Sequence, residues 1–131
     1  MSVPKKLVSG LAAIAVSLAM AVAVSSPAQA AGPKNGCPYG AACIYSGVTA
    51  EAIAQGPVAI WWDGVYTLNN VFNQRAIINN QYGGWVIQIC YGWYGTNCPP
   101  GGAIYEGLAG FPDMTPINSV WLHPGPPVFT W

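Results

Sequence analysis

Short runs of apolar, β-branched and aromatic residues, separated by turn-forming residues, dominate the chain after residue 40. The charged faces and Ala/Leu/Glu/Lys-rich stretches of long amphipathic helices are missing, whereas such short runs are typical of strands. Glycine, proline and asparagine punctuate the runs, as expected for strands joined by turns. The pattern predicts a compact all-β sandwich of about seven strands, at residues 42–45, 58–62, 65–68, 76–79, 85–90, 103–106 and 119–122.

Local signals refine this prediction at two places. Asp63-Gly64 is a strong hairpin-turn signal, so residues 65–68 are expected to pair with 58–62. The neighbours Trp61 and Trp62 must point to opposite faces if their strand is regular. Residues 48–56 fit either a single helical turn or an extended loop.

The first thirty residues have the pattern of a secretory signal peptide. Lys5 and Lys6 precede an apolar run at 7–24, and Ala28-Gln29-Ala30 supplies the small residues of a cleavage site. A retained membrane anchor is the alternative, because the run approaches the roughly 18–20 residues that span a bilayer. The small-x-small ending favours cleavage of residues 1–30 and a secreted, extracellular protein.

Charge is scarce, with four Lys or Arg and four Asp or Glu in 131 residues. Cleavage would remove Lys5 and Lys6 and leave Lys34 and Arg75 as the cations. Two cations cannot neutralise a row of phosphates or hold a protein on an anionic membrane. We therefore expect neither nucleic acid nor a membrane as a partner. We also expect the protein to be a monomer.

The four cysteines lie beyond the cleavage signal in two close pairs, Cys37 with Cys43 and Cys90 with Cys98. Disulfides commonly supplement the small core of a secreted domain. Three connectivities are open, and local pairing is the simplest. Each local bond would stabilise the fold by roughly 2–3 kcal/mol. A metal site is disfavoured because the two-residue spacer typical of zinc ligands is absent.

Residues 31–123 are expected to form one domain, followed by a Pro-rich tail at 124–131. The prolines lack ladder donors, so the segment from His123 onward is not expected to be a central strand. Phe129 and Trp131 either pack back onto the sandwich, which we favour, or contact a partner.

No pattern of catalytic residues stands out. The single histidine, His123, lies beside the tail and is expected at the surface. The acidic residues of the expected mature chain are scattered: Glu51, Asp63, Glu106 and Asp113. Without a nucleophile with its base, a carboxylate pair or a metal cluster, we expect no enzyme activity and no cofactor.

Residues 35–45 (NGCPYGAACIY) resemble the C-P-x-G-x-x-C opening of small secreted actinobacterial proteins grouped as peptidase inhibitor family I36. Residues 72–78 (FNQRAII), 79–81 (NNQ) and 115–120 (TPINSV) also resemble stretches of that family, in the same order. The resemblance implies a βγ-crystallin-like fold of two Greek-key motifs.

Many βγ-crystallins bind calcium at an [Asn/Asp]-[Asn/Asp]-x-x-[Ser/Thr]-Ser stretch, which supplies the oxygen ligands that calcium prefers. The first corner of this chain keeps Asn73 but has Ala76-Ile77 in place of hydroxyls. The second keeps Ser119 but has Thr115-Pro116 in place of an amide or acid pair. Neither site is complete, and we expect no metal.

The resemblance implies protease inhibition by a rigid, disulfide-braced loop. One candidate is the loop between Cys37 and Cys43. The favoured one is the aromatic loop between Cys90 and Cys98, because thermolysin-like metalloproteases prefer large apolar side chains after the cut. Its residues are Tyr91, Gly92, Trp93, Tyr94, Gly95, Thr96 and Asn97. The alternative is that both loops only tie strands together.

Two other functions stay open. An extracellular carbohydrate- or cell-wall-binding module would offer aromatic faces to sugar rings, from Trp61, Trp62, Trp85, Trp93 and Tyr94. A structural protein without inhibitory activity is equally compatible with low charge and local disulfides. A tryptophan patch left uncovered in the fold would favour a binding module.

Overall fold

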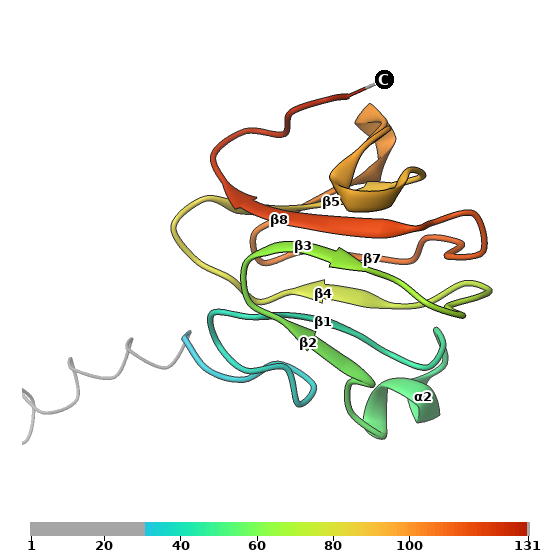
Figure 1. The fold of residues 1–131 in the computed structure, drawn as a ribbon. Coiled ribbons are helices and arrows are strands. Elements are labelled where there is room, and N and C mark those ends of the chain that lie inside the picture. Colours follow the sequence, from blue (N-terminus) through green and yellow to red (C-terminus); the bar gives the residue numbers. More distant parts are fainter. Residues whose placement is uncertain (1–30, 131) are drawn as a thin grey trace, which may run out of the picture. The chain divides into compact units, whose positions relative to one another are not determined.

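The structure, a computed structural model, describes residues 31–130. The predicted signal peptide 1–30 and Trp131 lie outside this range. Eight strands within it form two antiparallel four-stranded sheets (Figure 1). The strand order of the first sheet is β2 (Ala59–Trp61), β1 (Ala42–Ile44), β4 (Ile77–Asn79) and β7 (Ala109–Gly110).

The second sheet has the order β3 (Gly64–Thr67), β8 (Ser119–Pro124), β5 (Trp85–Cys90) and β6 (Ala103–Tyr105). The predicted all-β class is confirmed, and all seven predicted strands are present. The eighth, β7, was missed because Ala109-Gly110 is short and carries no β-branched or aromatic residue. The Greek-key connection implied by the resemblance stays a prediction.

One apolar core lies between the two sheets. Ile44 and Ile77 of the first sheet pack in the same cluster as Ile87, Ile89 and Leu122 of the second. In β5 these inward residues alternate with Val86, Gln88 and Cys90, which are also buried. The outer face of the second sheet must therefore be covered as well.

A second cluster surrounds the first disulfide. Cys37 and Cys43 are bonded to each other and pack with Tyr45 and Ile78. The Tyr45 hydroxyl donates to the Asn35 carbonyl at 2.8 Å, and burial raises the pKa of this phenol. Cys90 and Cys98 form the second bond, so the simplest pairing is confirmed.

The predicted hairpin at Asp63-Gly64 is wrong. β2 pairs antiparallel with β1 in the first sheet, whereas β3 pairs with β8 in the second. Gly64 has a positive φ of 82°, a left-handed conformation that glycine adopts at little cost. The turn therefore carries the chain from one sheet to the other instead of folding it back on the same sheet.

The prediction for the adjacent tryptophans is confirmed. Trp61 is 4 % exposed in the core, whereas Trp62, directly after β2, is 52 % exposed. Residues 48–56 contain a single helical turn, α2 (Ala50–Ala54), whose N-cap Thr49 accepts a hydrogen bond from the Ala52 amide. Within residues 31–130, no helix has the length and apolarity needed to span a bilayer.

The C-terminal boundary of the sheet differs from the prediction. β8 is a central strand that extends through His123 and Pro124, paired with Val86 and Trp85. The proline is tolerated because it is the last residue of the strand. The predicted domain boundary at residue 123 therefore falls inside a strand.

The tail lies on the second sheet through Val128 and Thr130. Phe129, which was expected to pack on the sandwich, is 41 % exposed, and Trp131 lies outside the described residues. The buried Gln88 amide donates from Nε2 to the Val128 carbonyl at 2.7 Å, and its Oε1 accepts from the Val128 amide at 2.9 Å. These two bonds orient the amide, so His123 must donate from Nε2 to bond the same Oε1. Thr130 Oγ1 accepts from the Cys98 amide. The histidine thus has a structural partner.

We expect Gln88→Met to release the tail, because methionine fills a similar volume but cannot pair with Val128. The free energy of unfolding should fall by about 1–2 kcal/mol. Amide hydrogen exchange at Val128 should accelerate by at least about tenfold. Gln74→Met, which changes an exposed glutamine, is the control. Unchanged exchange at Val128 would show that the Gln88 amide does not hold the tail.

Candidate functional site

The loop at 91–97 leaves the end of β5 and closes on itself at its base. The Cys90–Cys98 disulfide joins its ends. Directly inside it, the Tyr91 amide donates to the Asn97 carbonyl at 2.9 Å and the Gly92 amide to the Thr96 carbonyl at 3.0 Å. A covalent bond and two backbone hydrogen bonds therefore fix the base of the loop.

The apex is a tight turn, η2 (Trp93–Gly95). Tyr94 and Gly95 have positive φ values of 60° and 74°, and Thr96 Oγ1 donates to the Trp93 carbonyl at 2.7 Å. A left-handed tyrosine is uncommon, and surrounding contacts must hold it. The loop is a turned, internally bonded structure.

The loop also rests on the second sheet. Ser119 Oγ accepts from the Gly95 amide at 2.9 Å and donates to the Gly92 carbonyl at 2.7 Å. Asn118 Nδ2 donates to the Tyr91 carbonyl at 2.7 Å. A Cβ added to Gly95 would lie 3.1 Å from Val65 Cγ2, so the turn lies close against β3. The loop is thus held at its base and at its apex.

Three aromatic side chains of this loop face solvent. Tyr94 is 77 % exposed, and Tyr91 and Trp93 are also exposed. Trp93 borders a depression of about 220 Å³ that it shares with Leu68, Phe72 and other residues of the neighbouring turns. The structure therefore places the three predicted aromatic side chains in solvent on a constrained loop.

The other candidate loop, between Cys37 and Cys43, is more buried. Both cysteines are inaccessible, and the Ala41 amide donates to the Pro38 carbonyl. Tyr39 is the large exposed side chain of this loop, and its ring stacks on that of Tyr82. This loop serves mainly as a brace with one aromatic side chain on its surface.

The two corners that resemble calcium-binding stretches lie against each other. The Asn73 amide donates to Thr115 Oγ1 at 2.9 Å, and the Met114 amide donates to the Asn73 carbonyl. Asp113 accepts hydrogen bonds from the backbone and side chain of Thr115, which lower the pKa of this carboxyl. Thr115 Oγ1, the Asn73 carbonyl and the Asp113 carboxylate thus already accept hydrogen bonds from neighbouring residues.

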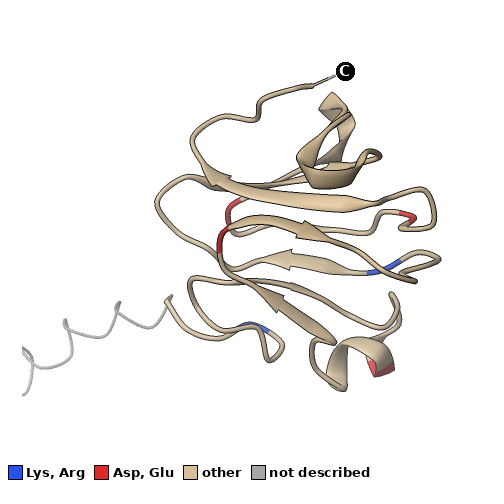
Figure 2. Ribbon diagram, in the orientation of Figure 1, with Lys and Arg blue, Asp and Glu red and all other residues tan. Residues whose placement is uncertain are grey.

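The other titratable residues are dispersed. Glu106 Oε2 accepts a hydrogen bond from the Gly84 amide, and His123 bonds Gln88. Figure 2 shows the few charged positions spread over separate segments. Across residues 31–130, no group of three or more His, Cys, Asp or Glu has the arrangement of a metal site.

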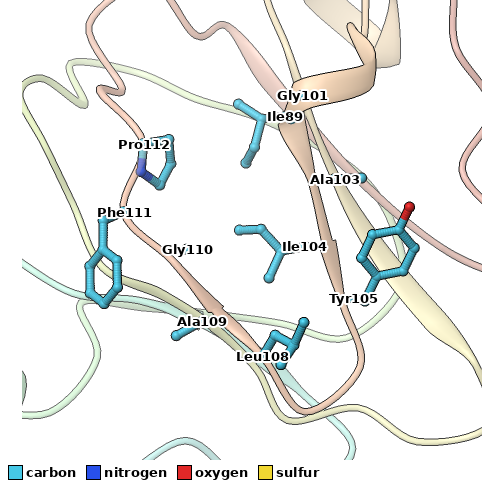
Figure 3. A pocket seen from close by; sticks show the side chains of 11 residues that line it. Ile89, Gly101, Ala103, Ile104, Tyr105, Leu108, Ala109, Gly110, Phe111 and Pro112 are labelled. Carbon is cyan, nitrogen blue, oxygen red and sulfur yellow. The ribbon is translucent and has the colours of Figure 1, made fainter.

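An apolar pocket of about 220 Å³ lies between the edge strands β6 and β7 (Figure 3). Ile104 lies at its centre, with Ile89, Leu108 and Phe111 around it. None of the predicted site residues lines this pocket. It was missed together with β7, whose residues form one of its walls.

The exposed aromatic pair Tyr39 and Tyr82 was also missed as a candidate binding surface. A signal was available, because both tyrosines lie in turn-forming stretches, Pro38-Tyr39-Gly40 and Gln81-Tyr82-Gly83. An aromatic side chain in a turn has no regular core face to occupy, so exposure was the simpler expectation.

No protein-family model matches the chain, and comparison with the curated proteins and with the solved structures found no similar protein. The likeness to the peptidase-inhibitor family therefore depends on the motifs at residues 35–45, 72–81 and 115–120.

Proposed function

We propose that the protein is a secreted peptidase inhibitor that blocks a metalloprotease with the loop at 91–97. One observation carries this proposal: the loop is ordered in the free protein and holds its large aromatic side chains in solvent. Two disulfides in a small domain are typical of extracellular proteins. Secretion, through the predicted signal peptide, is part of the proposal.

Preorganisation supplies the energetic reason. A flexible loop loses conformational entropy when a cleft immobilises it, and a loop that is already fixed avoids most of that cost. Trp93 and Tyr94 are of the residue types that dominate binding energy at protein interfaces. A cleft that accepts large apolar side chains, as in thermolysin-like metalloproteases, would match them.

The turned backbone defines how the loop would act. The carbonyls of Tyr91, Gly92 and Trp93 already accept hydrogen bonds from Asn118, Ser119 and Thr96. The backbone of the loop is therefore not extended and free to pair with a protease in the way that a substrate strand is. In our proposal the two aromatic side chains fill the cleft, and cleavage of the loop is not required.

We expect the double variant Trp93→Ala/Tyr94→Asn to weaken inhibition by at least about a hundredfold, because two central aromatic anchors are removed. Asparagine is chosen because it tolerates the left-handed backbone of Tyr94. The measurement is the inhibition constant of the oxidised protein against a panel of secreted metalloproteases and serine proteases.

Tyr82→Ala is the matched control, since it removes an equally exposed ring from outside the loop. If the double variant inhibits a protease as strongly as the unmodified protein does, the loop assignment is wrong. If the unmodified protein inhibits no protease in the panel, the proposal of inhibition itself is wrong.

A further inference from the structure

A small pocket of about 130 Å³ lies outside the loop at 91–97. Its walls come from three separate parts of the chain: Gly40, Trp62 and the segment containing Gln81, Tyr82 and Trp85. The five lining residues carry no charge. Aromatic walls with a few polar groups are typical of sites that bind small ligand groups.

The rings around this pocket are unusually accessible. Tyr82 is 56 % exposed, and Trp62 and Tyr39 are also exposed. Tyr39 stacks on Tyr82 with the ring centroids 4.9 Å apart and the planes at 22°. The stacked pair extends the aromatic surface beyond the pocket. The tail, which covers Gln88, leaves these rings open to solvent.

Gly40 allows the two main rings to approach each other. A Cβ at this position would lie 3.3 Å from Cε1 of Tyr82 and 3.8 Å from Cζ3 of Trp62. The φ of Gly40 is also positive, at 95°. Both the space and the backbone conformation therefore favour glycine at the floor of the pocket.

The supporting loop is fixed from both sides. The Cys37–Cys43 disulfide closes it, and the Gly40 amide donates to the Asn80 carbonyl at 2.8 Å. Asn80 Nδ2 donates in turn to the Cys37 carbonyl at 3.0 Å. The first disulfide thus braces a preformed surface as well as the core.

Gln81 has an unused hydrogen-bond acceptor. Its Nε2 donates to the Trp62 carbonyl at 2.9 Å, which fixes the orientation of the amide. Its Oε1 is buried and has no hydrogen-bond partner within residues 31–130. Such groups are rare in folded proteins and call for a bound water or ligand.

We propose that this pocket binds a neutral polysaccharide. A pyranose ring has apolar C–H faces that pack on aromatic rings and hydroxyl groups at its edge that donate hydrogen bonds. Trp62 and Tyr82 supply the aromatic surface, and Gln81 Oε1 accepts a hydrogen bond from a sugar hydroxyl that enters the pocket. The Tyr39–Tyr82 pair continues the surface toward the next sugar of the chain.

Two observations favour a sugar over a protein partner. The pocket is small, and its one amide side chain presents an acceptor that a single hydroxyl satisfies. Arginine, which is enriched together with aromatic residues at protein interfaces, is absent from its lining. This binding function is independent of protease inhibition, because the two surfaces share no residue.

The test uses the purified, oxidised protein and two soluble probes, the β-1,4-linked hexasaccharides of glucose and of N-acetylglucosamine. Isothermal titration and tryptophan fluorescence should detect binding of at least one. Trp62→Ala and Tyr82→Ala should each weaken it by at least about tenfold. Gln81→Met should weaken it as well, with thermal unfolding measured to separate this effect from a loss of stability.

Trp93→Ala, an exposed aromatic residue on the other surface, is the control and should bind normally. Failure of both hexasaccharides to bind at millimolar concentration overturns the proposal. So does binding that persists in Trp62→Ala and Tyr82→Ala. If these two variants abolish protease inhibition and no sugar binds, the pocket is a protein-binding surface and the proposal is wrong.

Discussion

Replacement of Cys37 and Cys43 by alanine is expected to lower the free energy of unfolding by about 3–4 kcal/mol. The chain-entropy model assigns about 2 kcal/mol to the short loop that this bond closes. The remainder comes from the cluster around it, because alanine leaves a cavity beside Tyr45 and Ile78. A domain of this size has a total stability of only about 5–15 kcal/mol.

The matched variant is Cys90→Ala/Cys98→Ala. This bond closes a loop of similar length but lies outside both apolar clusters. We expect its loss to cost about 2–3 kcal/mol, most of it from the freed chain, with a smaller cavity contribution from the two buried cysteines. Urea unfolding of the two double variants measures the difference. Equal losses would show that the cluster around the first disulfide relaxes without cost.

Much of the fold is predictable because its strands are locally encoded. β5 is a continuous run of apolar and β-branched residues apart from Gln88, and its predicted range matches the strand. The partners of the strands are less predictable. Asp63-Gly64 has the same local chemistry whether the chain folds back on one sheet or crosses to the other, and long-range pairing with β1 and β8 decides between them.

The same distinction applies to the candidate sites. Cys90 and Cys98 mark the limits of the aromatic loop in the sequence, so the loop was found. Its attachment to Ser119 was not, because these residues are far apart in the chain. The pocket at Gln81 is assembled from three segments, and only the fold brings Gly40 and Trp62 to it.

Asn79→Asp is expected to destabilise the protein by about 3–5 kcal/mol at neutral pH. Asn79 is fully buried in β4 of the first sheet, and its side chain bonds two strands of the second sheet. Its Nδ2 donates to the Ile104 carbonyl at 2.9 Å and to the Trp85 carbonyl at 3.2 Å, and its Oδ1 accepts from the Gln81 amide. An ionised carboxylate would place a negative oxygen against two carbonyls and leave both without a donor.

The loss should depend on pH in a defined direction. The new carboxyl at position 79 would have its pKa raised in the folded state by burial and by the two carbonyls. Below the unfolded-state pKa of about 3.9 the group is neutral in both states, and the penalty is smallest. As pH rises through that value, only the unfolded state loses its proton freely, so the difference from the unmodified protein grows.

Urea unfolding of both proteins at pH 3.5 and pH 7 measures this change. Asn69→Asp, at an exposed position, makes the same chemical substitution and should shift stability by less than about 0.5 kcal/mol at either pH. Asn79→Leu removes the donor without adding a charge, so its penalty should be the same at both pH values. A pH-independent loss in Asn79→Asp would mean that the loss comes from the missing hydrogen bonds and not from a buried charge.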